Sequence, residues 1–302
     1  MASEQPILIL GFGRSGTTWM SDIISKSLGG LILFEPMHPE VLSFAKHACY
    51  SSGLNDEMNN QLSKHLKSCL CKEVDNRWLI RNHLSANLQE VNEKYVEMIW
   101  RESDIIGMKL IRGNFMIPWL YQNVSKRIIY LEREVKSVVA SILKRPQFWM
   151  EFGFDFHYHK FTAEVINGKY RFLWNEKEMK SLLEGLEFEY EKITVMWALT
   201  SIVANYELGK LGIPVYSYEE LYKDPYKVTR EILTNLSGRN VAIHPSYIFT
   251  PSMLTHKTSH DLRIEDRFFH EADVSVFWRE RITNAQSTRI DYIMNRIGRA
   301  AV

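Results

Sequence analysis

The segment Gly11-Phe-Gly-Arg-Ser-Gly-Thr-Thr-Trp19 lies between an apolar run, Ile7–Leu10, and Met20–Leu28, where apolar residues recur with helical spacing. This order predicts a buried strand, a tight glycine turn and the first turn of a helix. Glycines let the backbone approach a phosphate closely, and the unpaired N–H groups and dipole of a helix N-terminus favour an anion. The segment therefore predicts a phosphate-binding loop, against the alternative of an ordinary glycine turn before a helix.

The polar residues of this segment resemble a nucleotide-binding loop that lacks one usual element. Its candidate ligand-binding residues are Arg14, Ser15, Gly16, Thr17 and Thr18. Gly11 and Gly16 have the G-x-x-x-x-G spacing of a Walker A motif, but Thr17 stands at the lysine position. Arg14 supplies a planar cationic group for phosphate instead. With no clear metal-binding aspartate nearby, the sequence disfavours ATP or GTP hydrolysis by the usual mechanism.

The length and the net charge of the chain limit the number of domains and the classes of ligand that we expect. A chain of 302 residues suffices for one large α/β domain, or for two small ones. Hydrophobic residues make up 45% and charged residues 24%, as in an ordinary globular protein. The net charge of +1 provides no broad basic field for nucleic acid or an anionic membrane. A phosphate site must therefore be a local cluster of basic residues.

The cysteines and the apolar runs indicate the cellular compartment in which we expect the protein. Cys49, Cys69 and Cys71 form neither a disulfide framework nor a zinc motif, so we expect reduced thiols and no bound metal. No apolar run approaches the roughly 18 residues of a membrane span. The first predicted strand begins within a few residues of Met1, which leaves no room for a signal peptide. We therefore expect a cytoplasmic protein.

Apolar runs and helical patterns alternate along much of the chain. The predicted strands lie at about 6–10, 31–34, 105–111, 127–131 and 213–218. The predicted helices lie at about 20–28, 115–124, 135–143, 189–209 and 226–236, with surface helices within 55–100. The stretch from 276 onward is predicted to end in a helix. Such alternation is typical of a parallel sheet with crossover helices. We expect an α/β fold, a three-layer sandwich with a central parallel sheet of the P-loop nucleotide-kinase-like kind.

A segment at about 145–188 has a different composition. It begins with many aromatic residues that follow no clean periodicity: Phe148, Trp149, Phe152, Phe154, Phe156, Tyr158, Phe161, Tyr170, Phe172 and Trp174. Such a concentration is consistent with a lid or substrate-pocket insertion. It is equally consistent with a packed accessory subdomain, and the sequence leaves both open.

The segment Arg14–Trp19 resembles the loop of the sulfotransferase family, and is closest to its cytosolic members. In that family the loop holds the 5′-phosphosulfate of 3′-phosphoadenosine 5′-phosphosulfate (PAPS). A second resemblance is the strand that ends at Arg133, with Ser141 eight residues later on the next predicted helix. The resemblance implies that Arg133 and Ser141 bind the 3′-phosphate, which distinguishes PAPS from ATP-like nucleotides.

Further similarities concern the nucleotide's base and a late loop. Tyr218 begins a Tyr-Glu-Glu segment similar to the family's Tyr-Glu-Asp, which implies a place near the adenine. The family match also implies that Trp19 packs on the adenine face. Thr255–His260 lies where the family often closes over the nucleotide, and it makes Lys257 and Ser259 candidate binding residues. The alternatives are that Tyr218 is a tyrosine of the hydrophobic core and that Thr255–His260 is an ordinary solvated loop.

The candidate base differs from that of cytosolic sulfotransferases. Those members carry a histidine two residues after a lysine that Lys109 matches, but Ile111 stands at that position here. Carbohydrate and tyrosylprotein sulfotransferases instead carry a glutamate about twenty residues after the loop cation. Glu35 follows Arg14 by 21 residues, in a Glu-Pro context similar to the carbohydrate type. Glu35 is thus the predicted base, with His38 as the second candidate. The alternative is that Glu35 caps a loop or pairs with a basic residue.

The resemblance extends over most of the chain and implies a single sulfotransferase domain, residues 1–302, with the insertion at about 145–188. The implied reaction moves the sulfuryl group of PAPS to a hydroxyl or amine of a carbohydrate or small-molecule acceptor and releases adenosine 3′,5′-bisphosphate (PAP). Arg14 and Lys109 would stabilise the transferring group. A P-loop kinase-like phosphotransferase and a catalytically silent nucleotide-binding protein are the alternatives. The acceptor and the oligomeric state stay open.

Overall fold

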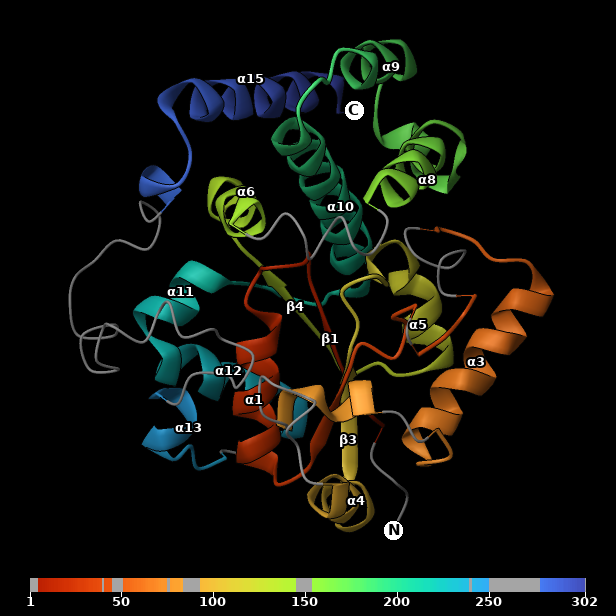
Figure 1. Ribbon diagram of the computed structural model, residues 1–302, viewed down its shortest axis with the longest axis vertical. Coiled ribbons are helices and arrows are strands. Elements are labelled where there is room, and N and C mark those ends of the chain that lie inside the picture. Colours follow the sequence, from red (N-terminus) through yellow and green to blue (C-terminus); the bar gives the residue numbers. More distant parts are fainter. Residues whose placement is uncertain are drawn as a thin grey trace.

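A five-stranded, all-parallel sheet forms the centre of the molecule (Figure 1). The computed structural model describes residues 5–39, 41–44, 51–74, 77–83, 93–144, 154–238, 241–249 and 278–301. The strands are β1 (Ile7–Leu10), β2 (Leu31–Phe34), β3 (Ile105–Lys109), β4 (Ile128–Glu132) and β5 (Val215–Ser217). Their order in the sheet is β2-β3-β1-β4-β5, and each neighbouring pair is parallel.

The strands are apolar because helices cover both faces of the sheet. Every residue of β1 and β2 is buried. Along β1, Ile7 and Ile9 pack into one hydrophobic cluster, while Leu8 and Leu10 pack into another on the opposite face. Continuous apolar runs of this kind are what a parallel sheet buried on both sides requires.

Helices connect the strands and extend beyond them. The α-helices before β4 are α1 (Thr17–Leu28), α3 (Asp56–Leu70), α4 (Glu93–Glu102) and α5 (Ile117–Asn123). The later ones are α6 (Val135–Leu143), α8 (Phe154–Asn167), α9 (Glu176–Glu184), α10 (Glu189–Leu211), α11 (Tyr218–Lys223), α12 (Pro225–Ser237), α13 (Pro245–Phe249) and α15 (Asn284–Ala300). Short 3₁₀ helices are η1 (Arg77–His83), η2 (Asn114–Met116) and η3 (Lys169–Leu173). None of these described helices has the length and apolar character needed to cross a bilayer.

Two sets of helices make the outer layers. Helices α1, α11 and α12 pack on the sheet face that carries Ile9 and Leu131, through side chains such as Met20 and Ile232. Helices α3, α5 and the C-terminal part of α10 pack on the face that carries Leu8. Figure 1 shows the sheet between these two sets. The expected three-layer α/β sandwich with a parallel sheet is confirmed.

A further helical cluster lies above the sheet in Figure 1, where α8, α9 and α15 surround the N-terminal part of α10. Tyr158, Phe161, Tyr170 and Trp174 are buried in it, whereas Phe172 is 53% exposed. The described part of the aromatic-rich segment therefore packs into a hydrophobic core that it shares with Phe12 and Phe115. Residues 145–153 of that segment lie outside the described residues.

The end of the last strand differs from the sequence prediction in a way that bears on the site. The strand expected to run to Tyr218 ends at Ser217, and Tyr218 begins α11. The hydroxyl of Ser217 accepts hydrogen bonds from the backbone N–H groups of Glu219 and Glu220, at 3.1 and 3.3 Å. A serine that caps two N–H groups in this way starts a helix. Tyr218 therefore sits at the carboxyl end of β5, next to the glycine loop.

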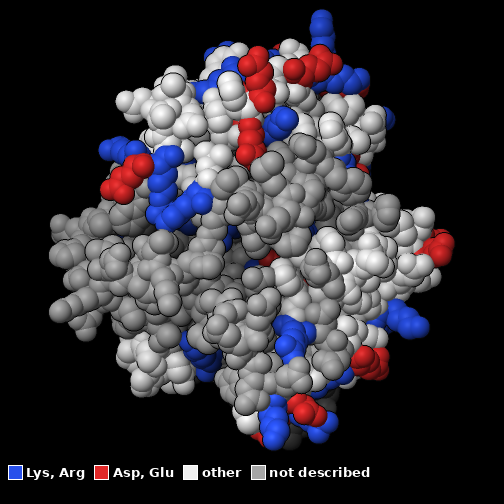
Figure 2. Space-filling model, viewed as in Figure 1, with Lys and Arg blue, Asp and Glu red and all other residues white. Residues whose placement is uncertain are grey.

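Charged side chains do not gather into one broad field on the described part of the face in Figure 2. Basic and acidic groups are interspersed there, as the net charge of +1 leads one to expect. On the described part of this face, an anion site would therefore have to be built from a few neighbouring residues.

Candidate functional site

The site predicted from the sequence lies at the carboxyl edge of the sheet. β1 leads into the loop Gly11–Gly16, β2 into Glu35, and β4 into Arg133, while Lys109 is the last residue of β3. Ligands of open α/β sheets bind outside the carboxyl ends of the strands, where the strand order reverses. Here β1 lies between β3 and β4, so the glycine loop is at that position.

Two glycines of the loop permit close contacts that no other residue would fit. A Cβ on Gly11 would lie 2.4 Å from the carbonyl oxygen of Leu131, and one on Gly16 would lie 2.3 Å from the ring of Tyr218. Gly16 has φ +86°, a left-handed conformation that suits glycine. Asn114 holds the loop, because its amide exchanges two 3.2 Å hydrogen bonds with the backbone of Gly11. Sequence analysis did not single out Asn114.

The loop offers donors suited to an anion. Ser15 is fully buried, and within the described part of the chain its hydroxyl has no hydrogen-bond partner. Helix α1 starts directly after Gly16, which has no side chain to cap its first N–H groups. A buried hydroxyl without a partner and an uncapped helix N-terminus are both stabilised by a bound phosphate-like group. The residues present therefore fit the predicted ligand.

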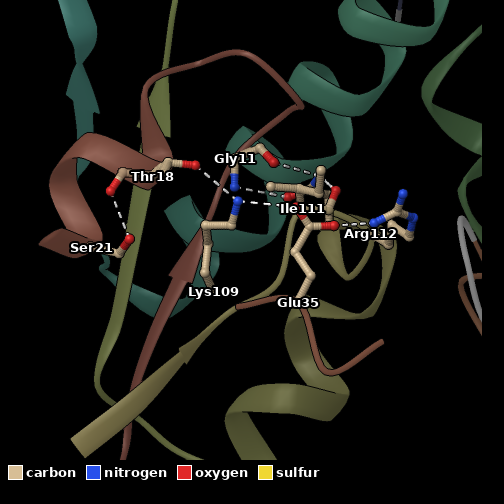
Figure 3. A network of polar contacts seen from close by, with 8 residues as sticks. Gly11, Thr18, Ser21, Glu35, Lys109, Ile111 and Arg112 are labelled. Carbon is tan, nitrogen blue, oxygen red and sulfur yellow. Dashed lines mark hydrogen bonds and ion pairs between the residues drawn. The ribbon is translucent and has the colours of Figure 1, made fainter. Parts of the chain in front are cut away.

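A buried ion-pair cluster lies beside the loop (Figure 3). Glu35 Oε1 lies 3.0 Å from Lys109 Nζ, and Glu35 Oε2 pairs with Arg112 Nη1. Lys109 Nζ also donates to the hydroxyl of Thr18 at 3.1 Å, which connects the cluster to α1. The same ammonium lies 3.8 Å from the ring centre of Phe34. Glu35, Lys109 and Thr18, all predicted site residues, are thus brought together.

The backbone of Glu35 has an unusual conformation. Its φ is +47°, which is uncommon for a residue with a side chain. Two backbone hydrogen bonds hold this turn: Glu35 N donates to Lys109 O at 3.0 Å, and His38 N donates to Glu35 O at 2.8 Å. His65 of α3 contacts the carbonyl oxygen of Pro36 at 3.0 Å. Such over-determined, strained positions are frequent at functional sites.

The charges of the cluster oppose the effect of burial on Glu35. Burial acts to raise the pKa of Glu35, but Coulombic attraction to Lys109 and Arg112 prevails and lowers the pKa to about 2. Burial lowers the pKa of Lys109, and the attraction to Glu35 offsets part of that shift. The Glu35 carboxyl is therefore ionised at neutral pH, as a proton acceptor must be.

His38, the second candidate base, is fully buried. Its ring stacks on Trp78, with the ring centres 4.0 Å apart. A Coulombic interaction with His38 also lowers the pKa of Glu35, after the contributions of Lys109 and Arg112. His38 therefore belongs to the same turn as Glu35, with its ring buried against Trp78.

A second group of predicted residues lies on the β4 side of the loop. Arg14 Nε donates to Ser141 Oγ at 3.0 Å, and Arg133 Nη1 donates to the carbonyl oxygen of Arg14 at 3.2 Å. The guanidinium of Arg133 lies 4.2 Å from the ring centre of Tyr218. Arg14, Arg133, Ser141 and Tyr218 therefore form one cluster around the loop.

The position of the Arg14 side chain differs from the sequence expectation. We expected it beside Glu35 and Lys109, at the end of the loop that would hold the sulfuryl group. It lies against Ser141 instead. Arg14 has φ +72°, a left-handed backbone conformation that its sequence context does not signal.

The predicted adenine contacts come together on α1 and α11. The rings of Trp19 and Tyr218 meet edge to face, with their centres 6.1 Å apart. Trp19 Nε1 donates to the carbonyl oxygen of Ile248 in α13 at 3.1 Å. The remaining candidates, Lys257 and Ser259, lie outside the described residues.

Arg112 is the residue of the ion-pair cluster that sequence analysis missed. It stands in the short turn after β3, three residues beyond Lys109. Its place just past the carboxyl end of a central strand was the available signal, because functional side chains concentrate there.

Comparisons of the chain with protein-family models, with curated proteins and with solved structures found no match. The assignment of a function therefore depends on the chemistry of the residues described above.

Proposed function

We propose that this protein is a PAPS-dependent sulfotransferase. The observation that carries the proposal is the presence of two basic groups on either side of one glycine loop. Arg14, Arg133 and Ser141 lie on the β4 side, and Lys109 and Arg112 lie on the β3 side. PAPS carries anionic groups at two separate positions, a 5′-phosphosulfate and a 3′-phosphate, and it suits such a divided site.

Each group would bind a different part of PAPS. Thr18, the buried hydroxyl of Ser15, which has no partner among the described residues, and the first N–H groups of α1 would hold the 5′-phosphosulfate. Arg133 and Ser141 would bind the 3′-phosphate through charge-assisted and hydroxyl hydrogen bonds. The rings of Trp19 and Tyr218 are the nearby aromatic surfaces for the adenine.

The transfer would be an in-line displacement at sulfur. The acceptor oxygen or nitrogen forms a bond to sulfur while the bond from sulfur to the bridging phosphate oxygen breaks, and PAP leaves with that electron pair. The acceptor proton goes to the carboxylate of Glu35. Lys109, which contacts both Glu35 and Thr18, is positioned to stabilise negative charge on the sulfuryl and bridging oxygens.

We propose a hydroxyl or amine of a carbohydrate or another small molecule as the acceptor. The Glu-Pro context of Glu35 favours a carbohydrate. We place the reaction in the cytoplasm, on the ground that the chain has few cysteines and that Cys69 and Cys71 are free thiols.

A catalytically silent PAP-binding protein is the second candidate. The observation in its favour is that each carboxylate oxygen of Glu35 has a cation as partner. Such pairing lowers basicity, and a base must free one oxygen for the acceptor proton. A phosphotransferase of the P-loop kinase type is less well supported, because Thr17 replaces the Walker lysine.

One experiment separates the three functions. The purified protein is incubated with sulfate-labelled PAPS or with γ-labelled ATP, together with a panel of carbohydrate, phenolic and amine acceptors. A sulfotransferase moves label from PAPS to an acceptor. Label moved from ATP would indicate a kinase, and binding of PAP without transfer to any acceptor would indicate the silent protein.

A further inference from the structure

The ion-pair cluster around Glu35 has a closed side and a more open side. On the closed side, the Lys109 side chain is 3% exposed, lies over Phe34 and donates to Thr18. On the other side, the Arg112 side chain is 12% exposed. Figure 3 shows Lys109 and Arg112 on opposite sides of the Glu35 carboxylate, with Arg112 on the side away from α1.

This arrangement distinguishes the two oxygens of Glu35. Oε1 belongs to the closed side, because Lys109 links it to the glycine loop. Oε2 belongs to the open side, where its partner is Arg112. An acceptor that gives its proton to Glu35 can reach Oε2 by taking the place of Arg112, whereas Oε1 stays bound behind Lys109.

We propose that Arg112 is a positioning residue of the transfer reaction: it holds Glu35 Oε2 on the open side of the cluster and keeps the carboxylate ionised until an acceptor replaces it. The inference rests on the proposed function for its catalytic meaning, but the effect of Arg112 on the Glu35 carboxyl does not depend on any substrate. In the transfer, the acceptor proton goes to Oε2 as the bond between acceptor and sulfur forms.

The groups that act on Glu35 come from three parts of the chain. Lys109 ends β3 and Arg112 follows it, while His38 lies in the turn after β2. Asp22 of α1 acts on Lys109 and so opposes its loss of charge. Glu35 is nearly fully buried, so removal of one cation leaves the cost of burial less well compensated. An uncharged residue at 112 should therefore make Glu35 markedly more basic.

The first test needs no ligand. The side-chain carboxyl signal of Glu35, assigned by its absence from E35Q, is followed by ¹³C NMR between pH 3 and pH 7 in wild type, R112Q and R112M. Wild type should show no titration of this signal in that range. The two variants should show a midpoint raised by about one to three pH units, the size of effect that one adjacent arginine exerts.

Two further variants control for charge and for stability. R112K keeps a positive charge and should keep most of the wild-type behaviour. R101Q removes an arginine from the exposed pair with Glu97 and should leave the Glu35 signal unchanged. R112M retains an apolar stem beside the site, so a folded neutral variant remains available if R112Q fails to fold. An unchanged Glu35 titration in a folded neutral variant would overturn the proposal.

The second test uses the reaction. With an acceptor that wild type sulfates, the acidic limb of kcat/KM should move to higher pH in R112Q and R112M, and not in R101Q. A merely structural role would lower the rate at every pH without moving the limb, and that result would also overturn the proposal. If wild type transfers no sulfate, the proposed function fails, while the NMR test of Arg112 still stands by itself.

Discussion

The guanidinium of Arg14 donates a 3.0 Å hydrogen bond to the hydroxyl of Ser141, although 127 residues separate the two in sequence. This bond joins the glycine loop after β1 to the helix after β4. Since Arg133 donates to the backbone oxygen of Arg14, the three residues form one polar unit at the position proposed for the 3′-phosphate.

Arg133 should determine the preference for a 3′-phosphate. R133Q should weaken PAP binding about 10- to 100-fold, because a hydrogen bond to a charged group contributes about 1.5 to 3 kcal/mol. Binding of ADP, which has no 3′-phosphate, should change little. Calorimetric titration of both nucleotides gives the measurement, with K126Q, at the other end of β4, as the control. Equal losses for PAP and ADP would contradict the assignment.

Arg14 and Ser141 should act together in binding. Because their side chains are bonded to each other, the effects of R14Q and S141A on PAP affinity should be non-additive, with a coupling of about 0.5 to 3 kcal/mol. A double-mutant cycle of PAP dissociation constants measures that coupling. Strict additivity would mean that the two residues contribute independently.

The glycine loop should tolerate no side chain at its last position. Gly16 and Gly29 both have positive φ, +86° and +73°, but an added Cβ meets the Tyr218 ring only at Gly16. G16A should therefore lower the free energy of unfolding by about 1 to 3 kcal/mol more than G29A, the usual cost of overpacking. Urea denaturation of the two variants gives the comparison. A larger loss in G29A would refute the close approach of Tyr218.

Much of the fold could be predicted from the sequence, because its physical causes are local. Buried strands such as Ile7–Leu10 are continuous apolar runs, and the alternation of such runs with helical patterns indicates a parallel sheet. The sheet order could not be read in the same way, because β3 inserts between β1 and β2, which are consecutive in the chain.

Part of the candidate site could be named from the sequence, but for a different reason. Glu35 and Lys109 were singled out because their sequence contexts resemble those of sulfotransferases. The pairing of Arg112 with Glu35 depends on a turn after β3 and on two strands being neighbours, and neither leaves a mark in the sequence. The side-chain direction of Arg14 depends on its left-handed backbone.

Glu35 should stabilise the fold at neutral pH and lose that contribution in acid. The pKa of Glu35 is lowered from 4.5 to about 2, so its stabilisation is present above pH 4.5 and is lost as the pH falls toward 2. The contribution is on the order of 3 kcal/mol. Unfolding free energies measured from pH 6 to pH 3 should fall more steeply in wild type than in E35Q.

The control for that comparison is E97Q, which removes a carboxylate from the exposed pair with Arg101. Its pH dependence should parallel that of wild type, because exposed ion pairs contribute little. Parallel curves for wild type and E35Q would mean that the buried pairs with Lys109 and Arg112 do not hold Glu35 ionised.

The most direct test of the account is the rate of sulfate transfer from labelled PAPS in wild type and in E35Q, with PAP affinity measured in both. Since a general base contributes about 10²- to 10⁴-fold, E35Q should lose at least about 100-fold in transfer rate while it still binds PAP. Transfer by E35Q at the wild-type rate, or transfer of label from ATP in place of PAPS, would contradict the account.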